Sequence, residues 1–203
     1  MNSRVILVSD DRSSLRSPDT LLWPDAACMR GIHTGEWTAH IFEYAMSFEG
    51  NMTQVRELAA ANGVGVLHPH GALATDPPGL IVCDVDSTVT RTEAIDLLAE
   101  CAGNADEVRE ITARAMVGEL DFTQSLYARV RCLEGLHIGA LEEAWKATVI
   151  TPGTAELVAA AHDVGAAVGL VSGGFTAIVD PLAEQIRADF AASNELEIVD
   201  NHL

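Results

Sequence analysis

Basic residues and paired cysteines are scarce in this 203-residue chain. Twelve Lys and Arg face 30 Asp and Glu, so the formal net charge is −18. That charge argues against nucleic acid or an anionic membrane as a partner, because both are themselves negative. The four cysteines, at positions 28, 83, 101 and 132, show no CxxC or other paired spacing. We therefore expect reduced thiols in a cytoplasmic protein and no zinc site among them.

Long apolar runs are also missing. No stretch approaches the 18 apolar residues that suggest a transmembrane helix, and the first residues carry only a very short apolar run before acidic ones. We therefore expect a soluble intracellular protein. Hydrophobic residues still make up 48% of the chain, which is enough for a core. The length allows one medium domain with a smaller appendage, or two small domains.

Residues 1–75 are predicted to form a small α+β unit. Short strands are expected over 4–9, 41–48 and 64–67, a polar loop over 10–23, and a helix over 52–62. His68 and His70 form an HxH pair, for which a surface loop is favoured over a metal site because no third ligand is apparent. The prolines and glycine of segment 74–79 predict a linker.

Residues 79–203 predict an α/β domain. Strands are expected over 79–83 and 166–171, with helices over 154–164 and 176–186, and this alternation implies a parallel sheet. Helical periodicity runs from 93 to 149 between the two strands. In that insertion Asn104 is predicted to cap a helix ending near Met116, and Asp121 with Gln124 resembles a capping box for a helix over 122–133. A hairpin turn is expected near Asp200.

Two carboxylates follow the first buried strand. Asp84 and Asp86 leave an extended backbone on the same side and repel by roughly 3 kcal/mol at about 5 Å with an effective dielectric near 20. A bound proton or a divalent cation relieves that repulsion, and Mg²⁺ suits oxygen ligands beside a phosphate. The sequence Ser172-Gly173-Gly174 follows the second strand and is expected at a helix start, where its backbone N–H groups can cradle a phosphate. The plainer alternative for these residues is turn formation or helix capping.

Four segments together resemble a known family. They are DVDST at 84–88, TEAIDLLAE at 92–100, AMVGELDFTQSLYARV at 115–130 and VSGGF at 171–175. They are similar to the phosphoserine phosphatases of the haloacid dehalogenase superfamily, from about residue 79 onwards. The resemblance implies a parallel Rossmann-like core with a helical cap over about 92–150. It also implies Mg²⁺-dependent hydrolysis of O-phospho-L-serine, the last step of serine biosynthesis.

The resemblance also implies roles for single residues. Asp84 would be the nucleophile that forms an aspartyl phosphate, and Asp86 would be the general acid and then the base. Mg²⁺ would bind the Asp84 carboxylate and the Asp86 carbonyl. Ser172 and Gly173 would hold the phosphate oxygens.

Substrate choice would lie in the helical insertion. By the same resemblance, Glu93 would meet the substrate ammonium, Arg129 its carboxylate, and Met116 and Phe122 would form an apolar lid. The plainer alternatives are exposed charges on a helix face for Glu93 and Arg129, and ordinary core positions for Met116 and Phe122.

The resemblance is incomplete at the end of the chain. Members continue to a lysine that steadies the phosphate and an aspartate that completes the Mg²⁺ site, whereas this chain ends at Leu203 and its only lysine is Lys146. We therefore expect a truncated chain with weak or absent activity, and an open apolar sheet edge that could pair into a homo-oligomer. The alternative function is a catalytically impaired module that binds an amino acid or phosphate. A third is a phosphotransferase that uses an alcohol acceptor.

Overall fold

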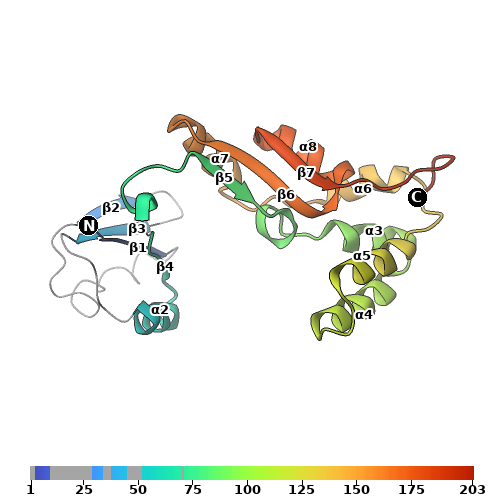
Figure 1. The fold of residues 1–203 in the computed structure, drawn as a ribbon, viewed down its shortest axis with the longest axis horizontal. Coiled ribbons are helices and arrows are strands. Elements are labelled where there is room, and N and C mark those ends of the chain that lie inside the picture. Colours follow the sequence, from blue (N-terminus) through green and yellow to red (C-terminus); the bar gives the residue numbers. More distant parts are fainter. Residues whose placement is uncertain (1–2, 10–28, 34–37, 45–51, 70) are drawn as a thin grey trace. The chain divides into compact units, whose positions relative to one another are not determined.

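The computed structural model describes residues 3–9, 29–33, 38–44, 52–69 and 71–203 (Figure 1). The chain divides into two compact units, Met1–Pro77 and Pro78–Leu203. The division falls between two adjacent prolines. Neither proline has a backbone N–H to donate to a helix or sheet, so regular structure does not run through this point.

The first unit is an antiparallel sheet with one helix. The strand order is β2-β3-β1-β4, with β1 at Ser3–Ser9, β2 at Met29–His33, β3 at Thr38–Tyr44 and β4 at Gly65–Leu67, and the helix α2 spans Met52–Ala61. Side chains of β1, α2 and the α2–β4 turn form its core, namely Val5, Leu7, Val55, Ala59 and Val64. This confirms the predicted small α+β region.

Several predictions for the first unit differ in their bounds. The strand expected over 41–48 begins earlier, at Thr38, and its last four predicted residues lie outside the described residues, as do the loop 10–23 and His70. The helix α2 ends as expected before Gly63, whose φ of 68° suits glycine at a helix C-terminus.

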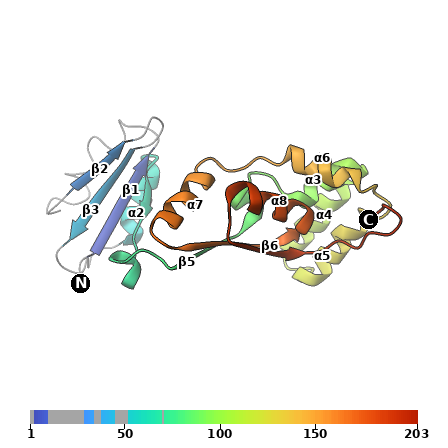
Figure 2. The ribbon, with the colours of Figure 1, turned by 90° about the horizontal axis from the view of Figure 1, so that it is seen from above.

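The second unit is built on a parallel sheet. The strands β5 (Leu80–Cys83), β6 (Ala167–Phe175) and β7 (Phe190–Asn194) pair in the order β5-β6-β7. Helices α7 (Thr154–Asp163) and α8 (Thr176–Ile186) cover one face of this sheet (Figure 2). The buried contact joins apolar side chains of both layers, among them Val158, Val168, Leu170, Val179 and Leu182. The predicted α/β core is confirmed.

The other face of the sheet is exposed. Leu80, Val82 and Phe190 have relative exposures of 53%, 51% and 43%, and β5 is an edge strand, paired only with β6 among the described strands. The Phe190 ring lies directly over Gly169, where a Cβ would come within 1.9 Å of it. Gly169 is therefore required for this close packing.

Four helices form the insertion between β5 and β6. They are α3 (Ala94–Ala102), α4 (Ala105–Met116), α5 (Phe122–Arg131) and α6 (Gly139–Ala147). Their core includes Leu98, Val108 and Leu133 and reaches Phe175 at the end of β6. The two ends of the insertion run side by side, because Arg91 N donates to Val149 O (2.7 Å) and Thr151 N donates to Val89 O (2.9 Å).

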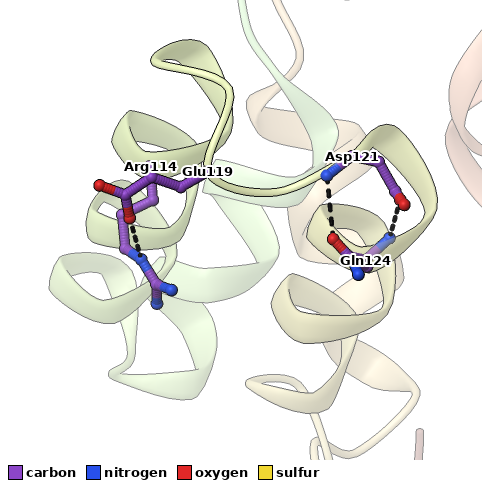
Figure 3. A network of polar contacts seen from close by, with 4 residues as sticks. All are labelled: Arg114, Glu119, Asp121 and Gln124. Atoms are coloured by element: carbon purple, nitrogen blue, oxygen red, sulfur yellow. Dashed lines mark hydrogen bonds and ion pairs between the residues drawn. The ribbon is translucent and has the colours of Figure 1, made fainter.

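One of the two predicted helix caps in the insertion is confirmed. Asp121 Oδ1 accepts from Gln124 N (2.8 Å), and Gln124 Oε1 accepts from Asp121 N (3.1 Å), which is the predicted capping box (Figure 3). Asn104 is the N-cap residue of α4, which ends at Met116 as predicted, but its side chain makes no capping bond to this helix. Its amide donates instead to the carbonyl of Cys132 at the end of α5 (2.7 Å), where the helix leaves carbonyls unpaired.

The strand β6 is longer than predicted. It continues through Phe175, with a register shift against β7 between Val171 and Phe175. Ser172, Gly173 and Gly174 therefore lie in this irregular strand end and not at a helix start, since α8 begins only at Thr176. A bulge of this kind turns backbone groups away from the ladder.

The segment after β7 forms the turn predicted near Asp200. Asp200 and Asn201 adopt φ of 49° and 64°, and Val199 and His202 exchange two backbone bonds of 2.9 Å, as in a two-residue hairpin. The tail also pairs with the α5–α6 connection, because Gly135 N donates to Leu203 O (2.8 Å) and Leu203 N to Leu136 O (2.9 Å).

Candidate active site

A cavity of about 230 Å³ lies where the insertion meets the carboxyl ends of β5 and β6. In open parallel sheets, this is where ligands bind. The cavity is lined by residues from the β5–α3 loop, α3, α5 and the end of β6, namely Asp84, Asp86, Glu93, Ile95, Phe122, Leu126, Arg129, Gly173, Gly174 and Phe175.

Asp84 stands directly after β5, where the chain turns over Val85–Val89. Its Oδ2 accepts a hydrogen bond from the hydroxyl of Thr88 at 3.0 Å, and its carboxylate is exposed to the cavity. The turn that follows is closed by a bond from Thr90 N to Val85 O (2.9 Å). Asp84 therefore has an oriented carboxylate that a ligand can reach.

Asp86 is held from three sides. Its Oδ1 accepts from Ala94 N at the start of α3 (2.8 Å), and its Oδ2 accepts from the Ser172 hydroxyl (3.1 Å). A Cβ at Gly174 would come within 2.7 Å of Oδ2, so a side chain at that position would push the Asp86 carboxylate out of its present place.

Glu93 and Arg129 bring opposite charges from two helices of the insertion. Glu93 immediately precedes α3, and its Oε1 accepts from the Ser87 hydroxyl (3.2 Å). Arg129 lies in the last turn of α5, where its Nε donates to Ser125 O (3.4 Å). That contact does not use the two Nη groups, which form the fork that pairs with a carboxylate.

The two predicted lid residues are placed differently. Phe122, at the start of α5, lines the cavity, and its ring lies over Gly173, where a Cβ would come within 3.2 Å of the ring. Met116, at the end of α4, does not line this cavity, and its side chain is 83% exposed. The structure therefore places Phe122 in the candidate site and Met116 outside it.

Ser172 and Asn194 fix the irregular end of β6. Ser172 is buried, and its Oγ accepts from Gly174 N (2.8 Å). Asn194 at the end of β7 donates from Nδ2 to Gly173 O (2.9 Å) and Gly174 O (3.4 Å). Sequence reasoning missed Asn194, and its place at the end of a parallel strand was the only signal that could have pointed to it.

The charges in the cavity are unbalanced. Among the described residues that line it, Asp84, Asp86 and Glu93 face the single cation Arg129. No group of three or more potential His, Cys, Asp or Glu ligands occurs in the described ranges. Mg²⁺ nevertheless fits this donor set, because it is usually held by one or two protein carboxylates, waters and a substrate phosphate.

The fold and the site together define a hydrolase class. The family profile of haloacid dehalogenase-like hydrolases matches residues 78–201, which include the whole cavity. The chain belongs to this family.

Similar proteins within this family are phosphoserine phosphatases. The phosphoserine phosphatase of Streptomyces coelicolor is 47% identical over 145 residues, covering 71% of this chain and 35% of the relative. That of Lactococcus lactis is 46% identical over 125 residues, covering 62% of this chain and 58% of the relative. The chain thus spans about a third to three fifths of the curated relatives it matches.

Solved structures agree with this relationship. The unliganded structure of a probable phosphoserine phosphatase from Vibrio cholerae superposes with a TM-score of 0.74 at 33% identity, covering 98% of this chain and 61% of that one. A substrate-bound phosphoserine phosphatase complex gives a TM-score of 0.59 at 38% identity over 63% of this chain and 61% of that one.

Within the described ranges, no helix is long and apolar enough to cross a bilayer.

Proposed function

We propose that this cavity is the site of a Mg²⁺-dependent phosphoserine phosphatase, with α3–α6 acting as its cap. The observation that carries the proposal is the grouping of Asp84, Asp86, Glu93 and Arg129 around one cavity. It offers a nucleophile, a proton donor, a site for an ammonium and a site for a carboxylate, the groups needed for an amino-acid phosphate. The names of the relatives support the same substrate.

Asp84 begins the proposed reaction. Its free carboxylate oxygen attacks the phosphorus of O-phospho-L-serine, so that a new P–O bond forms while the bond to the serine oxygen breaks. Asp86 gives its proton to that leaving oxygen, which departs as the hydroxyl of L-serine. The Thr88 bond to the other oxygen of Asp84 orients the nucleophile.

In the second step Asp86 acts as a general base. As a carboxylate it takes a proton from a water molecule, and the water oxygen attacks the phosphorus of the aspartyl phosphate. The bond to Asp84 breaks, inorganic phosphate leaves, and Asp86 is protonated again. In the structure, the hydrogen bonds from Ala94 N and Ser172 Oγ orient the Asp86 carboxylate toward the cavity before substrate binds.

The remaining residues hold the substrate. Ser172 and Gly173 would bind phosphate oxygens, Glu93 the ammonium and Arg129 the carboxylate, with Phe122 covering the site against water. In the proposed enzyme the Asp84 carboxylate and the Asp86 carbonyl would hold Mg²⁺. When bound, this ion would offset the charge of phosphate and carboxylates together.

We also propose a pathway and a cellular location for this reaction. Formation of L-serine suits the last step of serine biosynthesis. A cytoplasmic location is supported by Cys83, Cys101 and Cys132, which are free thiols.

One observation favours a second function, a module that binds an amino acid or phosphate without turnover. Arg129 is the only cation among the described residues that line the cavity. The only lysine of the chain, Lys146, lies on α6 and pairs with Glu142 at 2.6 Å. A site with so little positive charge stabilises the transferring phosphoryl group poorly.

Two measurements separate these functions. Phosphate release from O-phospho-L-serine with Mg²⁺, lost in Asp84→Asn, supports the phosphatase. Trapping of beryllofluoride at Asp84, followed by fluorine NMR and absent in Asp84→Asn, detects the nucleophile even at low turnover. Saturable serine or phosphate binding with neither signal would overturn the phosphatase proposal and support the binding module.

A further inference from the structure

Ser87 has an unusual backbone conformation for its place in the chain. Its φ of 56° and ψ of 13° lie in the left-handed region, directly after the extended Asp86. The other described non-glycine residues with positive φ end a helix (Arg187) or form the hairpin turn (Asp200 and Asn201). Ser87 lies instead inside the turn over Val85–Val89, directly beside Asp86 of the candidate site. Strain of this kind persists where surrounding contacts require it, and it concentrates at functional sites.

The contacts of this loop show what the conformation achieves. Asp86 accepts from Ala94 N at 2.8 Å, and Ser87 Oγ donates to Glu93 Oε1 at 3.2 Å. Asp86 and Ser87 of the loop are thus hydrogen-bonded to Ala94 and Glu93 at the start of α3. The Glu93 side chain makes no capping bond to its own helix. Within the part of the chain that the structure describes, the hydrogen bond from Ser87 orients its carboxylate.

We propose that Ser87 is a positioning residue that holds the Glu93 carboxylate for the ammonium of the substrate. This inference rests on the proposed function. A hydroxyl suits the task because it is neutral, so it fixes one carboxylate oxygen without cancelling the charge that attracts the ammonium. The other oxygen, Oε2, is not used by this contact. A long, flexible glutamate side chain loses rotamer freedom on binding, and holding it in advance reduces that loss.

Ser87 acts through Glu93 and not on the ligand. It is absent from the residues that line the cavity, whereas Glu93 is among them. The strain and the hydroxyl can also be separated, because Ser87→Gly removes the hydroxyl and adopts positive φ freely, while Ser87→Ala removes the hydroxyl and keeps the strain. If only the backbone mattered, Ser87→Gly would behave like the wild-type chain.

The test compares two ligands that differ only in the ammonium. They are O-phospho-L-serine and 3-phosphooxypropionate, and their dissociation constants are measured by calorimetry, with KM and kcat wherever turnover is seen. We expect Ser87→Ala and Ser87→Gly to weaken phosphoserine binding about 3- to 10-fold and to leave the ammonium-free ligand within about twofold. Neither should weaken phosphoserine binding further in a Glu93→Gln background. Thr123→Ala, an exposed hydroxyl removed from the first turn of α5, is the matched control.

Other results would overturn the inference. Wild-type preference for phosphoserine retained in Ser87→Gly would show that the hydroxyl is not needed. Equal weakening of both ligands would show that Ser87 acts on the phosphate side or on folding, which thermal melting of both variants checks. A wild-type chain that binds neither ligand, or binds both equally well, would instead refute the proposed function, and this inference with it.

Discussion

The Ser172 hydroxyl and the Asp86 carboxylate lie 3.1 Å apart, although 86 residues separate them in the sequence. The same hydroxyl accepts from Gly174 N at 2.8 Å. Ser172 thus joins the end of β6 to the loop after β5, and it shapes the strand end while orienting the proposed general acid. Stability and chemistry depend on the same side-chain oxygen.

Replacing Ser172 by Ala is therefore expected to affect both properties. The N–H of the buried Gly174 would lose its partner, at a cost of about 1–3 kcal/mol in the free energy of unfolding. Turnover or binding of O-phospho-L-serine should fall about 10-fold or more, because Asp86 loses an orienting bond. Urea unfolding and calorimetry measure the two effects. Ser172→Thr, which keeps a hydroxyl, is the control, and an Ala variant equal to wild type in both measurements would contradict this role.

Asn194 offers a second test of the strand end. Asn194→Asp keeps the size of the side chain but replaces the donor to Gly173 O and Gly174 O by a carboxylate, which can only repel those carbonyls. We expect a loss of about 1–3 kcal/mol in unfolding free energy and weaker vanadate binding at the cavity. Glu195→Gln, a charge change at the neighbouring exposed residue, should alter neither. Unchanged vanadate affinity in Asn194→Asp would show that Asn194 does not support the site.

Local chemistry explains which parts of the structure were predictable. The capping box of Asp121 and Gln124 formed as predicted because both partners lie within one helical turn. The helix expected over 176–186 has those bounds in the structure, since its apolar period and its flanking residues agree. The carboxylates after the first strand were found for a similar reason, because a short apolar run ending in acids is a local signal.

The features that the sequence did not predict depend on contacts between residues far apart in the chain. Asn104 occupies the predicted N-cap position of α4, but its side-chain amide donates to the carbonyl of Cys132, 28 residues away, and not to its own helix. The extension of β6 through Phe175 depends on a register shift against β7, which no pattern within β6 reveals. Asn194 was missed because its partners lie on a neighbouring strand. The lid role of Met116, which the resemblance implies, stays a prediction, because its side chain is exposed and does not line the cavity described here.

The unpaired edge of the parallel sheet, with its exposed apolar side chains, predicts self-association. Leu80 and Val82 lie on the edge strand β5, and unpaired apolar edges pair with other chains. The net charge of −18 opposes this pairing, so we expect association to strengthen as salt rises and screens the charge. Sedimentation velocity across protein and salt concentrations measures it. Val82→Lys should reduce association, whereas Leu157→Lys, at a 48% exposed position on α7, should change it less. A chain that is monomeric throughout would refute the prediction.

The capping box makes α5 sensitive to one residue. Asp121→Ala removes the acceptor for Gln124 N, which costs about 1 kcal/mol and lowers the melting temperature by about 2–4 °C in a chain of this length. Because α5 carries Phe122 and Arg129, we expect Asp121→Ala also to weaken the binding of phosphoserine. Asp121→Asn retains a capping oxygen and serves as the control. Equal melting temperatures for the Ala and Asn variants would contradict the role of the cap.

Asp189 predicts a pH dependence of stability. Its Oδ2 accepts from Val168 N (2.6 Å) and contacts His162 Nε2 (3.0 Å). The backbone bond from Val168, and then the bond to His162, lower the pKa of Asp189 below its ordinary value. Because the folded-state pKa is the lower one, the unfolded chain binds the proton more readily. The stabilisation is therefore full above the unfolded pKa, near pH 4, and is lost as pH falls through the lower folded value.

Removing the Asp189 carboxylate should make the free energy of unfolding less dependent on pH at acid pH. We expect Asp189→Asn to lower the free energy of unfolding at pH 6 and to lose less of it than the wild type between pH 6 and pH 3. Both side chains of the pair are partly exposed, so the difference should shrink in high salt. Urea unfolding at each pH measures it, with Asp180→Asn, an exposed carboxylate on α8, as the control. If Asp189→Asn follows the wild-type curve at every pH, the bonds from Val168 and His162 do not favour the ionised carboxylate in the folded chain.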